Sequence, residues 1–306
     1  MMQTRTDKRT AAPPMAMRLK LTIAYDGRPY TGWQSQPGGK TVQDHLQRAL
    51  GEIAKRAMVI HGSGRTDTGV HALGQVAHVE VPQPTTMRPS NWLRAINSKL
   101  PATIRVMACE AVPEEFHARF SACGKIYHYD ICTAPVLPPH RAGLVWHLPQ
   151  GLDMDCLGLA LGRVCGRHDY HAFAAYRGDE TAAMDYHRTL HTAELEVLAD
   201  GCRITYVGDG FLYKMVRLLT GAVVKVGQGK LELAALSRLL DQGVGLPHGK
   251  SPHCAPADGL YLQQVLYPDD GCRDPAPSER NSANIGALQV GRVESCSRGD
   301  AAGSDF

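Results

Sequence analysis

Hydrophobic and polar residues alternate along several stretches of the chain. Leu19, Leu21, Ile23 and Tyr25 fall on one face of residues 18–25. This period of two is typical of a half-buried strand. Similar patterns predict further strands at 59–61, 73–81, 103–112, 125–133, 190–198, 202–207 and 257–262.

Apolar residues spaced three or four apart predict amphipathic helices between these strands. Thr41, followed by Asp44, resembles a capping box that starts the first helix. The predicted helices cover 42–53, 90–100, 153–164, 211–226 and 231–240. We interpret residues 166–173 as a loop, and Asp200-Gly201 as the turn of a hairpin.

Strands and helices follow one another on both sides of a proline-rich bridge at 135–150. The pattern predicts two α+β halves, 18–134 and 151–267, that face each other with a site between them. Two polar segments, 1–17 and 268–306, are expected to be an N-terminal extension and a disordered tail. A third polar segment, 177–186, is expected to be exposed.

Composition limits the classes of function only weakly. The chain has 306 residues, is 43% hydrophobic and carries a net charge of +3, so its charge alone does not indicate a nucleic-acid partner. The nine cysteines include no C-x-x-C pair, which favours free thiols in a reducing cytoplasm over a disulfide framework or a zinc site. We find neither a membrane-spanning run nor a signal peptide, and we expect a cytoplasmic protein.

The glycine-rich stretch 62–72 concentrates reactive residue types between two predicted strands. Asp67 lies two residues after Arg65, and a carboxylate kept ionised beside a cation suits a nucleophile. The alternative is a turn with a surface ion pair. A phosphate-binding loop would need G-x-x-x-x-G-K-[ST], which is absent. A metal site at His187 and His191 would need a helix, and it lacks the glutamate of H-E-x-x-H.

The stretch 64–72 resembles the signature of the TruA-type tRNA pseudouridine synthases. Other stretches agree with this family in order along the chain: Tyr25-Asp26-Gly27, Gly32-Trp33-Gln34, Gly74-Gln75-Val76, and residues 116–122, 125–129, 211–217 and 258–262. The resemblance runs from about residue 18 to 267.

The resemblance implies an enzyme that isomerises uridine to pseudouridine in the tRNA anticodon stem-loop, at positions 38 to 40. It further implies a homodimer that uses no metal and no organic cofactor. The implied fold is a central, largely antiparallel sheet built from two similar halves, with the active-site cleft between them.

The resemblance also implies roles for three catalytic residues. Asp67 would attack C6 of the base or C1′ of the sugar, or stabilise the cleaved sugar. Arg217 would be its ion-pair partner, although a solvated helix arginine is the plainer interpretation. Tyr127 would stack on the flipped uracil and could take the C5 proton, although it could also be an ordinary strand aromatic.

The target base must leave its stem-loop, and the family's RNA-contacting residues assist this step. Arg65 matches an arginine that helps to extrude the base, and Arg88 is a candidate for a second. The segment Phe116, His117, Ala118, Arg119 and Phe120 matches one that contacts tRNA, where Arg119 and His117 would meet phosphates. We expect His71 to order the loop through hydrogen bonds.

Three features depart from the family pattern. Thr68 replaces the alanine usual after the catalytic aspartate, residues 184–188 differ from a segment expected to touch tRNA, and the tail after Tyr267 has no counterpart. A catalytically inactive RNA-binding protein of the same fold is the main rival. Against this rival, such a protein does not need Asp67, Tyr127 and Arg217 together.

Overall fold

The computed structural model describes residues 17–82, 85–176, 184–241 and 251–270. The N-terminal extension up to residue 16, most of the segment predicted to be exposed and most of the tail lie outside these residues. The strands of the described part are β1 (Met17–Tyr25), β2 (Ile60–Gly62), β3 (His71–Val81), β4 (Ile104–Val112), β5 (Gly124–Cys132), β6 (Trp146–His147), β7 (Gly166–Asp169), β8 (His187–Leu198), β9 (Gly201–Gly208) and β10 (Leu260–Leu266). Its helices are α1 (Val42–Ala54), α2 (Pro89–Lys99), α3 (Met154–Val164), α4 (Met215–Gly227), α5 (Leu233–Asp241) and the short η1 (Pro139–Arg141), η2 (His171–Phe173) and η3 (Pro268–Asp270).

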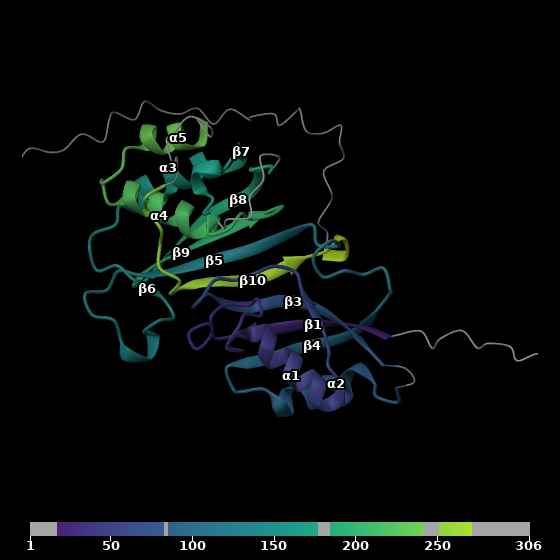
Figure 1. The fold of residues 1–306 in the computed structure, drawn as a ribbon. Coiled ribbons are helices and arrows are strands. Elements are labelled where there is room, and N and C mark those ends of the chain that lie inside the picture. Colours follow the sequence, from purple (N-terminus) through teal and green to yellow (C-terminus); the bar gives the residue numbers. More distant parts are fainter. Residues whose placement is uncertain (1–16, 83–84, 177–183, 242–250, 271–306) are drawn as a thin grey trace, which may run out of the picture. The chain divides into compact units, whose positions relative to one another are not determined.

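The described strands form one sheet in the order β4-β1-β3-β10-β5-β9-β8-β7 (Figure 1). Short β2 pairs with β3, and short β6 pairs with β5. Neighbours along the main path are antiparallel except β10 and β3, which run parallel. The predicted α+β fold with a largely antiparallel sheet is confirmed.

The alternating pattern of β1 produces a strand with one buried face. Leu19, Leu21 and Ile23 are fully buried, and burying each such side chain contributes about 1.5–3 kcal/mol. Leu19 pairs with Val79 of β3, whereas Lys20 on the opposite face pairs with His78. The second face of β1 therefore carries charged and polar side chains.

Local capping signals set the starts of two helices. Thr41 and Asp44 form the predicted capping box of α1, and Asp153 accepts a hydrogen bond from the Cys156 amide at 2.9 Å to start α3. In Figure 1, α2 lies against β4 and α3 lies against β8. The two ends of the sheet thus have separate helical layers.

Some predictions of local structure are wrong. Residues 166–173 form β7 and η2 instead of a loop. Helix α4 begins at Met215 because Lys214 adopts a left-handed φ of 58°, which interrupts the predicted helix after residue 211. Strand β10 begins at Leu260, after Gly259 turns with a φ of 84°.

The cysteine prediction holds only in part. Six described cysteines are free thiols, but Cys123 is disulfide-bonded, so the expectation of free thiols alone is wrong. Among the described helices, none is long and apolar enough to cross a membrane.

Candidate active site

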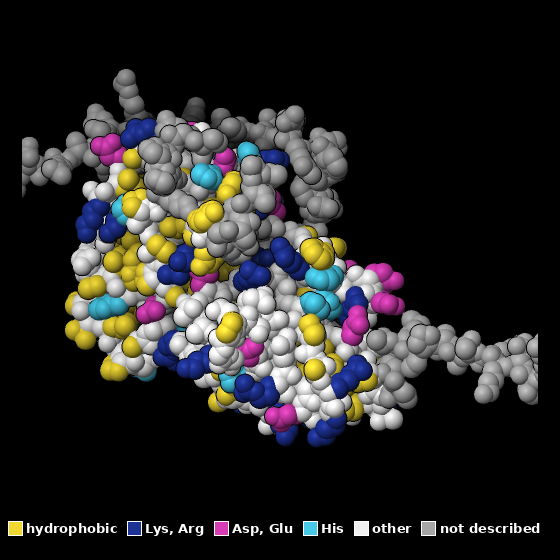
Figure 2. Space-filling model, in the orientation of Figure 1, with side chains coloured by type: hydrophobic (Ala, Val, Ile, Leu, Met, Phe, Trp, Pro, Cys, Tyr) yellow, Lys and Arg dark blue, Asp and Glu magenta, His cyan; other side chains and the backbone are white. Residues whose placement is uncertain are grey.

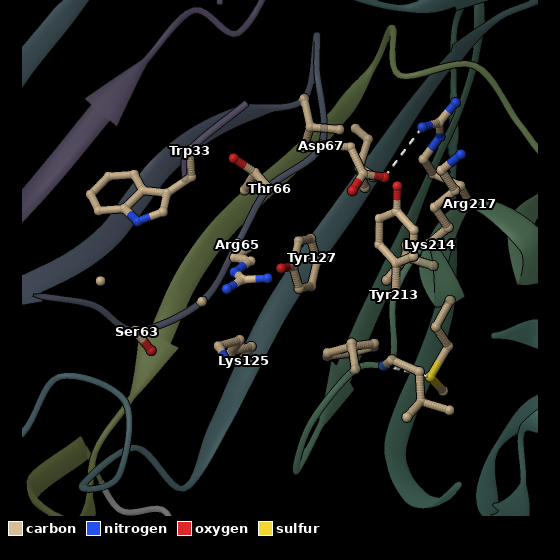
Figure 3. Close-up of a pocket in the computed structure, with 18 of the residues that line it drawn as sticks. Trp33, Ser63, Arg65, Thr66, Asp67, Lys125, Tyr127, Tyr213, Lys214 and Arg217 are labelled. Carbon is tan, nitrogen blue, oxygen red and sulfur yellow. Dashed lines mark hydrogen bonds and ion pairs between the residues drawn. The ribbon is translucent and has the colours of Figure 1, made fainter. Parts of the chain in front are cut away.

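A cavity of about 390 Å³ opens where the loop after β2, strand β5 and the start of α4 meet (Figure 3). Its charged lining residues are one carboxylate, Asp67, and five cations: Arg65, Arg119, Lys125, Lys214 and Arg217. On the face drawn in Figure 2, Lys and Arg side chains gather across the middle of the molecule. This excess of positive charge favours an anionic ligand.

A tight turn presents Asp67 to this cavity. The Val70 amide donates to the Asp67 carbonyl at 3.1 Å, and Gly69 supplies the φ of 81° that such a turn requires. Strands β2 and β3 bracket the loop, so its ends are fixed by the sheet. The carboxylate therefore projects from a rigid support, as a catalytic group requires.

A second loop packs against the backbone immediately before Asp67. The Trp33 amide donates to the Thr66 carbonyl at 3.1 Å, while the Thr66 hydroxyl and the Tyr25 phenol hydrogen-bond at 2.8 Å. Gly32 has a φ of 91°, and a Cβ there would lie 2.6 Å from the Thr66 carbonyl oxygen. Glycine is thus needed for the two loops to approach this closely.

His71 connects the loop to two other segments. Its Nδ1 accepts a hydrogen bond from the Gly27 amide at 3.1 Å, and its Nε2 donates to the Gly143 carbonyl at 3.0 Å. Burial lowers the pKa of His71, which keeps the ring neutral, as these two bonds require. The predicted ordering role of His71 is confirmed by these contacts.

Asp67 and Arg217 form an ion pair at the cavity wall. Arg217 Nη1 lies 3.2 Å from Asp67 Oδ2, and the side chains are 17% and 19% exposed. Arg217 Nε also donates to the Ala255 carbonyl at 2.9 Å, which fixes the guanidinium from a second side. Arg217 lies in the first turn of α4, whose positive dipole end adds to the attraction for an anion.

Tyr127 of β5 lies in the same cavity, where its ring makes an edge contact with Phe211 at a centroid distance of 5.0 Å. The side chain is buried, and that burial, together with the nearby charges of Tyr25 and Asp67, raises the pKa of Tyr127 far above its usual range. The phenol is therefore protonated at neutral pH and can donate a hydrogen bond. Figure 3 shows Tyr127 between Arg65 and the Asp67–Arg217 pair.

The two predicted extruding arginines occupy different places. Arg65 lines the cavity, and its Nε donates to the Gln34 side chain at 3.2 Å. Arg88 is exposed at the start of α2 and is not among the residues that line the cavity. The roles of both arginines stay predictions.

The segment predicted to contact tRNA divides between two environments. Arg119 lines the cavity and Phe120 is 76% exposed. Ala118 is buried, and its amide donates to His78 Nδ1 at 3.1 Å. Phe116 packs on the Tyr267 ring. The roles of this segment, including His117, also stay predictions.

Lys125, Tyr213 and Lys214 are among the lining residues that were not predicted as site residues. Lys125 is half-buried, and burial together with the nearby charge of Arg119 lowers the pKa of its ammonium group to about 8. Lys125 lies two residues before Tyr127 on the same strand, so both side chains belong to the same face of the sheet. The sequence could have revealed this relation. Lys214 carries no such signal, because the sequence places it inside a helix.

The described residues contain no group of three or more His, Cys, Asp or Glu side chains placed to hold a metal ion. His187 and His191 both lie on strand β8 rather than on a helix. The metal-hydrolase interpretation therefore finds no support in this part of the chain.

A carboxylate–arginine pair and a buried tyrosine in a cationic cavity are typical of an enzyme that acts on a polyanion. The sequence pattern of one enzyme family, tRNA pseudouridine synthase, matches residues 21–121 and 160–268. The chain belongs to this family of isomerases.

Curated relatives match along most of the chain. A tRNA pseudouridine synthase A of Akkermansia muciniphila is 49% identical over 256 residues, which are 83% of this chain and 96% of that protein. Those of Chromobacterium violaceum and Bacillus licheniformis are 42% and 38% identical, and the matches cover 83% and 82% of this chain and 94% and 99% of theirs.

Proposed function

We propose that this protein isomerises uridine to pseudouridine in the anticodon stem-loop of tRNA, at positions 38 to 40. The observation that carries the proposal is the Asp67–Arg217 pair, which holds one carboxylate in a cavity whose other charged lining residues are all cations. Membership of the tRNA pseudouridine synthase family supports tRNA as the substrate.

The reaction breaks the bond between ribose C1′ and N1 and makes a bond between C1′ and C5. N1 gains a proton and C5 loses one, so no oxidant or reductant is needed. Asp67 serves as the nucleophile, at C6 or C1′, or stabilises the cleaved sugar. Arg217 orients the carboxylate because it is itself held by the Ala255 carbonyl.

The substrate base enters the cavity only after it leaves the stem-loop, at a cost of a few kcal/mol. Tyr127 stacks on the flipped base and is placed to handle the C5 proton. Arg65 and Arg88 assist extrusion, and the 116–120 segment holds the RNA backbone.

The proposal is tested by tritium release from tRNA labelled at uridine C5. We expect release by the unmodified protein and none above background by Asp67→Asn, because the amide cannot act as a nucleophile. Asp130→Asn is a matched control, since Asp130 is also 19% exposed and ion-paired, with Arg203, but does not line the cavity. Equal release by Asp67→Asn and the unmodified protein would refute the role of Asp67.

The rival function is tRNA binding without catalysis. It predicts tight tRNA binding by the unmodified protein together with no tritium release. The same assay therefore separates the two functions, provided that tRNA affinity is measured in parallel.

We further propose a cytoplasmic homodimer and retain the division into halves at 18–134 and 151–267. Light scattering coupled to size exclusion should give about twice the 33.2 kDa chain mass. A mass equal to one chain would contradict the dimer.

A further inference from the structure

Beside the candidate active site lies a second cavity of about 400 Å³, and of its lining residues only His117 has been given a role above. Three histidines line it from different elements: His61 on β2, His78 on β3 and His117 in the loop between β4 and β5. Arg18 and Arg56 add positive charge, and Glu80 adds one carboxylate. Figure 2 shows histidines next to the Lys and Arg side chains of the central face.

The three imidazole rings pack directly on one another. His61 stacks on His78 with ring centroids 5.0 Å apart, and His78 meets His117 edge-on at 4.5 Å. The sheet register brings the first two together, because His61 of β2 pairs with His78 of β3. His78 is buried, whereas His61 is exposed.

Backbone amides fix the tautomers of two of these rings. The Ala118 amide donates to His78 Nδ1 at 3.1 Å, and the Arg119 amide donates to His117 Nδ1 at 3.1 Å. An Nδ1 that accepts must lack a proton, so in each neutral ring Nε2 carries the N–H. Both rings therefore present hydrogen-bond donors rather than lone pairs at Nε2, which favours an anion over a metal ion.

The charged side chains around the rings sum to a net positive charge, which is available to a ligand. Glu80 is ion-paired with Arg18, whose Nη1 also donates to the Phe116 carbonyl at 2.9 Å. Among the described residues, the exposed Arg56 side chain has no hydrogen-bond or ion-pair partner. Burial and the other histidines lower the pKa of His78 to about 4, so this ring stays neutral and keeps its tautomer at physiological pH.

Neighbouring residues of the chain line the two cavities. His61 lines the second cavity while the next residue, Gly62, lines the first. Likewise His117 lines the second cavity while Arg119 lines the first. An RNA strand that enters one cavity can thus extend a phosphate to the other.

We propose that this three-histidine cavity binds a backbone phosphodiester of the RNA substrate, next to the nucleotide held in the active site. Neutral Nε2–H groups and the Arg56 guanidinium would donate to the phosphate oxygens. The inference rests on the proposed function for the identity of the RNA.

The test compares the double variant His61→Gln/Arg56→Gln with the unmodified protein. Both residues are exposed, so the fold should be kept. A matched control is His191→Gln/Arg163→Gln, which changes an exposed histidine and an exposed arginine that line neither cavity. The affinity for an anticodon stem-loop RNA is measured over a series of salt concentrations.

We expect the His61/Arg56 variant to bind about tenfold more weakly and to lose about one unit of the salt slope. Tritium release at saturating RNA should be unchanged. Replacing one phosphate linkage of the RNA with a neutral methylphosphonate should weaken its binding to the unmodified protein. The same replacement should not further weaken RNA binding to the variant. The control variant should match the unmodified protein throughout.

Unchanged RNA affinity and salt slope in the His61/Arg56 variant would overturn the proposal. Inorganic phosphate binding is measured on the same proteins. If the His61/Arg56 variant loses inorganic phosphate binding but keeps its RNA affinity, the proposal is also overturned, because the cavity is then a site for the free ion. Absence of tritium release by the unmodified protein would refute the proposed function. The salt dependence of RNA affinity, compared between the variant and the unmodified protein, would still report on RNA binding at this cavity.

Discussion

Lys125 places an amine whose charge depends on pH inside the candidate active site. Its pKa is lowered to about 8 by burial and by the neighbouring Arg119. The ammonium form is therefore present below about pH 8 and is lost as the pH rises through that value. Because a phosphate attracts only the charged form, RNA affinity should depend on this proton.

We predict that RNA affinity falls by about tenfold between roughly pH 7 and pH 9 in the unmodified protein, as one charged hydrogen bond is lost. Lys125→Arg should show a flatter profile, because arginine stays charged. Lys125→Gln should bind weakly throughout this range. Fluorescence anisotropy with labelled stem-loop RNA measures all three, and parallel curves for the unmodified protein and Lys125→Arg would contradict the assignment.

Arg217 also acts through its particular geometry. Its Nε and Nη1 contact the Ala255 carbonyl and Asp67 at the same time. A lysine ammonium keeps the charge but cannot reproduce this planar arrangement of donors.

We predict that Arg217→Lys lowers kcat by about a hundredfold, because a small misplacement of a reacting group is costly. KM for tRNA should change little. Arg203→Lys is the matched control, since it alters an arginine–aspartate pair, with Asp130, that does not line the cavity. Steady-state tritium release gives both constants, and a kcat equal to that of the control would count against the role of Arg217.

At the scale of the element, the loop that carries Asp67 depends on its contact with the loop around Gly32. Only a residue without a side chain allows the Thr66 carbonyl to come so close. The same contact lets the Trp33 amide donate to Thr66. The position of the Asp67 loop is therefore set by two segments together.

We predict that Gly32→Ala destabilises the protein by about 1–3 kcal/mol and lowers kcat by shifting Asp67. Gly38→Ala separates clash from backbone strain, because Gly38 has a similar φ of 107° but open space around its Cβ position. Urea unfolding and tritium release measure the two effects. Equal losses in both variants would mean that strain, and not loop contact, is responsible.

At the scale of the whole molecule, the last described strand forms a seam between two strands that come much earlier in the chain. Strand β10 pairs in parallel with β3 and antiparallel with β5, so it lies between them in the sheet (Figure 1). Its Leu262 is fully buried and stands opposite Tyr127. Packing at this seam should therefore affect both stability and the site.

We predict that Leu262→Ala lowers the free energy of unfolding by about 2–5 kcal/mol and also reduces kcat. Leu236→Ala, at a fully buried position on α5, should destabilise by a similar amount and keep kcat. Denaturant unfolding and single-turnover kinetics test the pair. A normal kcat in Leu262→Ala would argue against coupling between the seam and Tyr127.

The sequence by itself determined most of the local structure, because the signals for it lie within a few residues. Alternation along β1 and the capping box at Thr41 act over one strand or one turn, and both were predicted. The interrupted start of α4 was missed because Lys214 adopts a backbone conformation that its residue type does not announce. Strand β7 was missed because four mainly polar residues show little alternation.

Tertiary structure alone decided which distant residues share a site. Arg217 and Asp67 are 150 residues apart, and only the family resemblance, not any periodicity, suggested their pairing. The parallel insertion of β10, the histidine cavity and the place of Lys214 likewise depend on contacts between segments remote in sequence. Local patterns specify which face of an element is buried, whereas the partner of that face depends on how the whole chain packs.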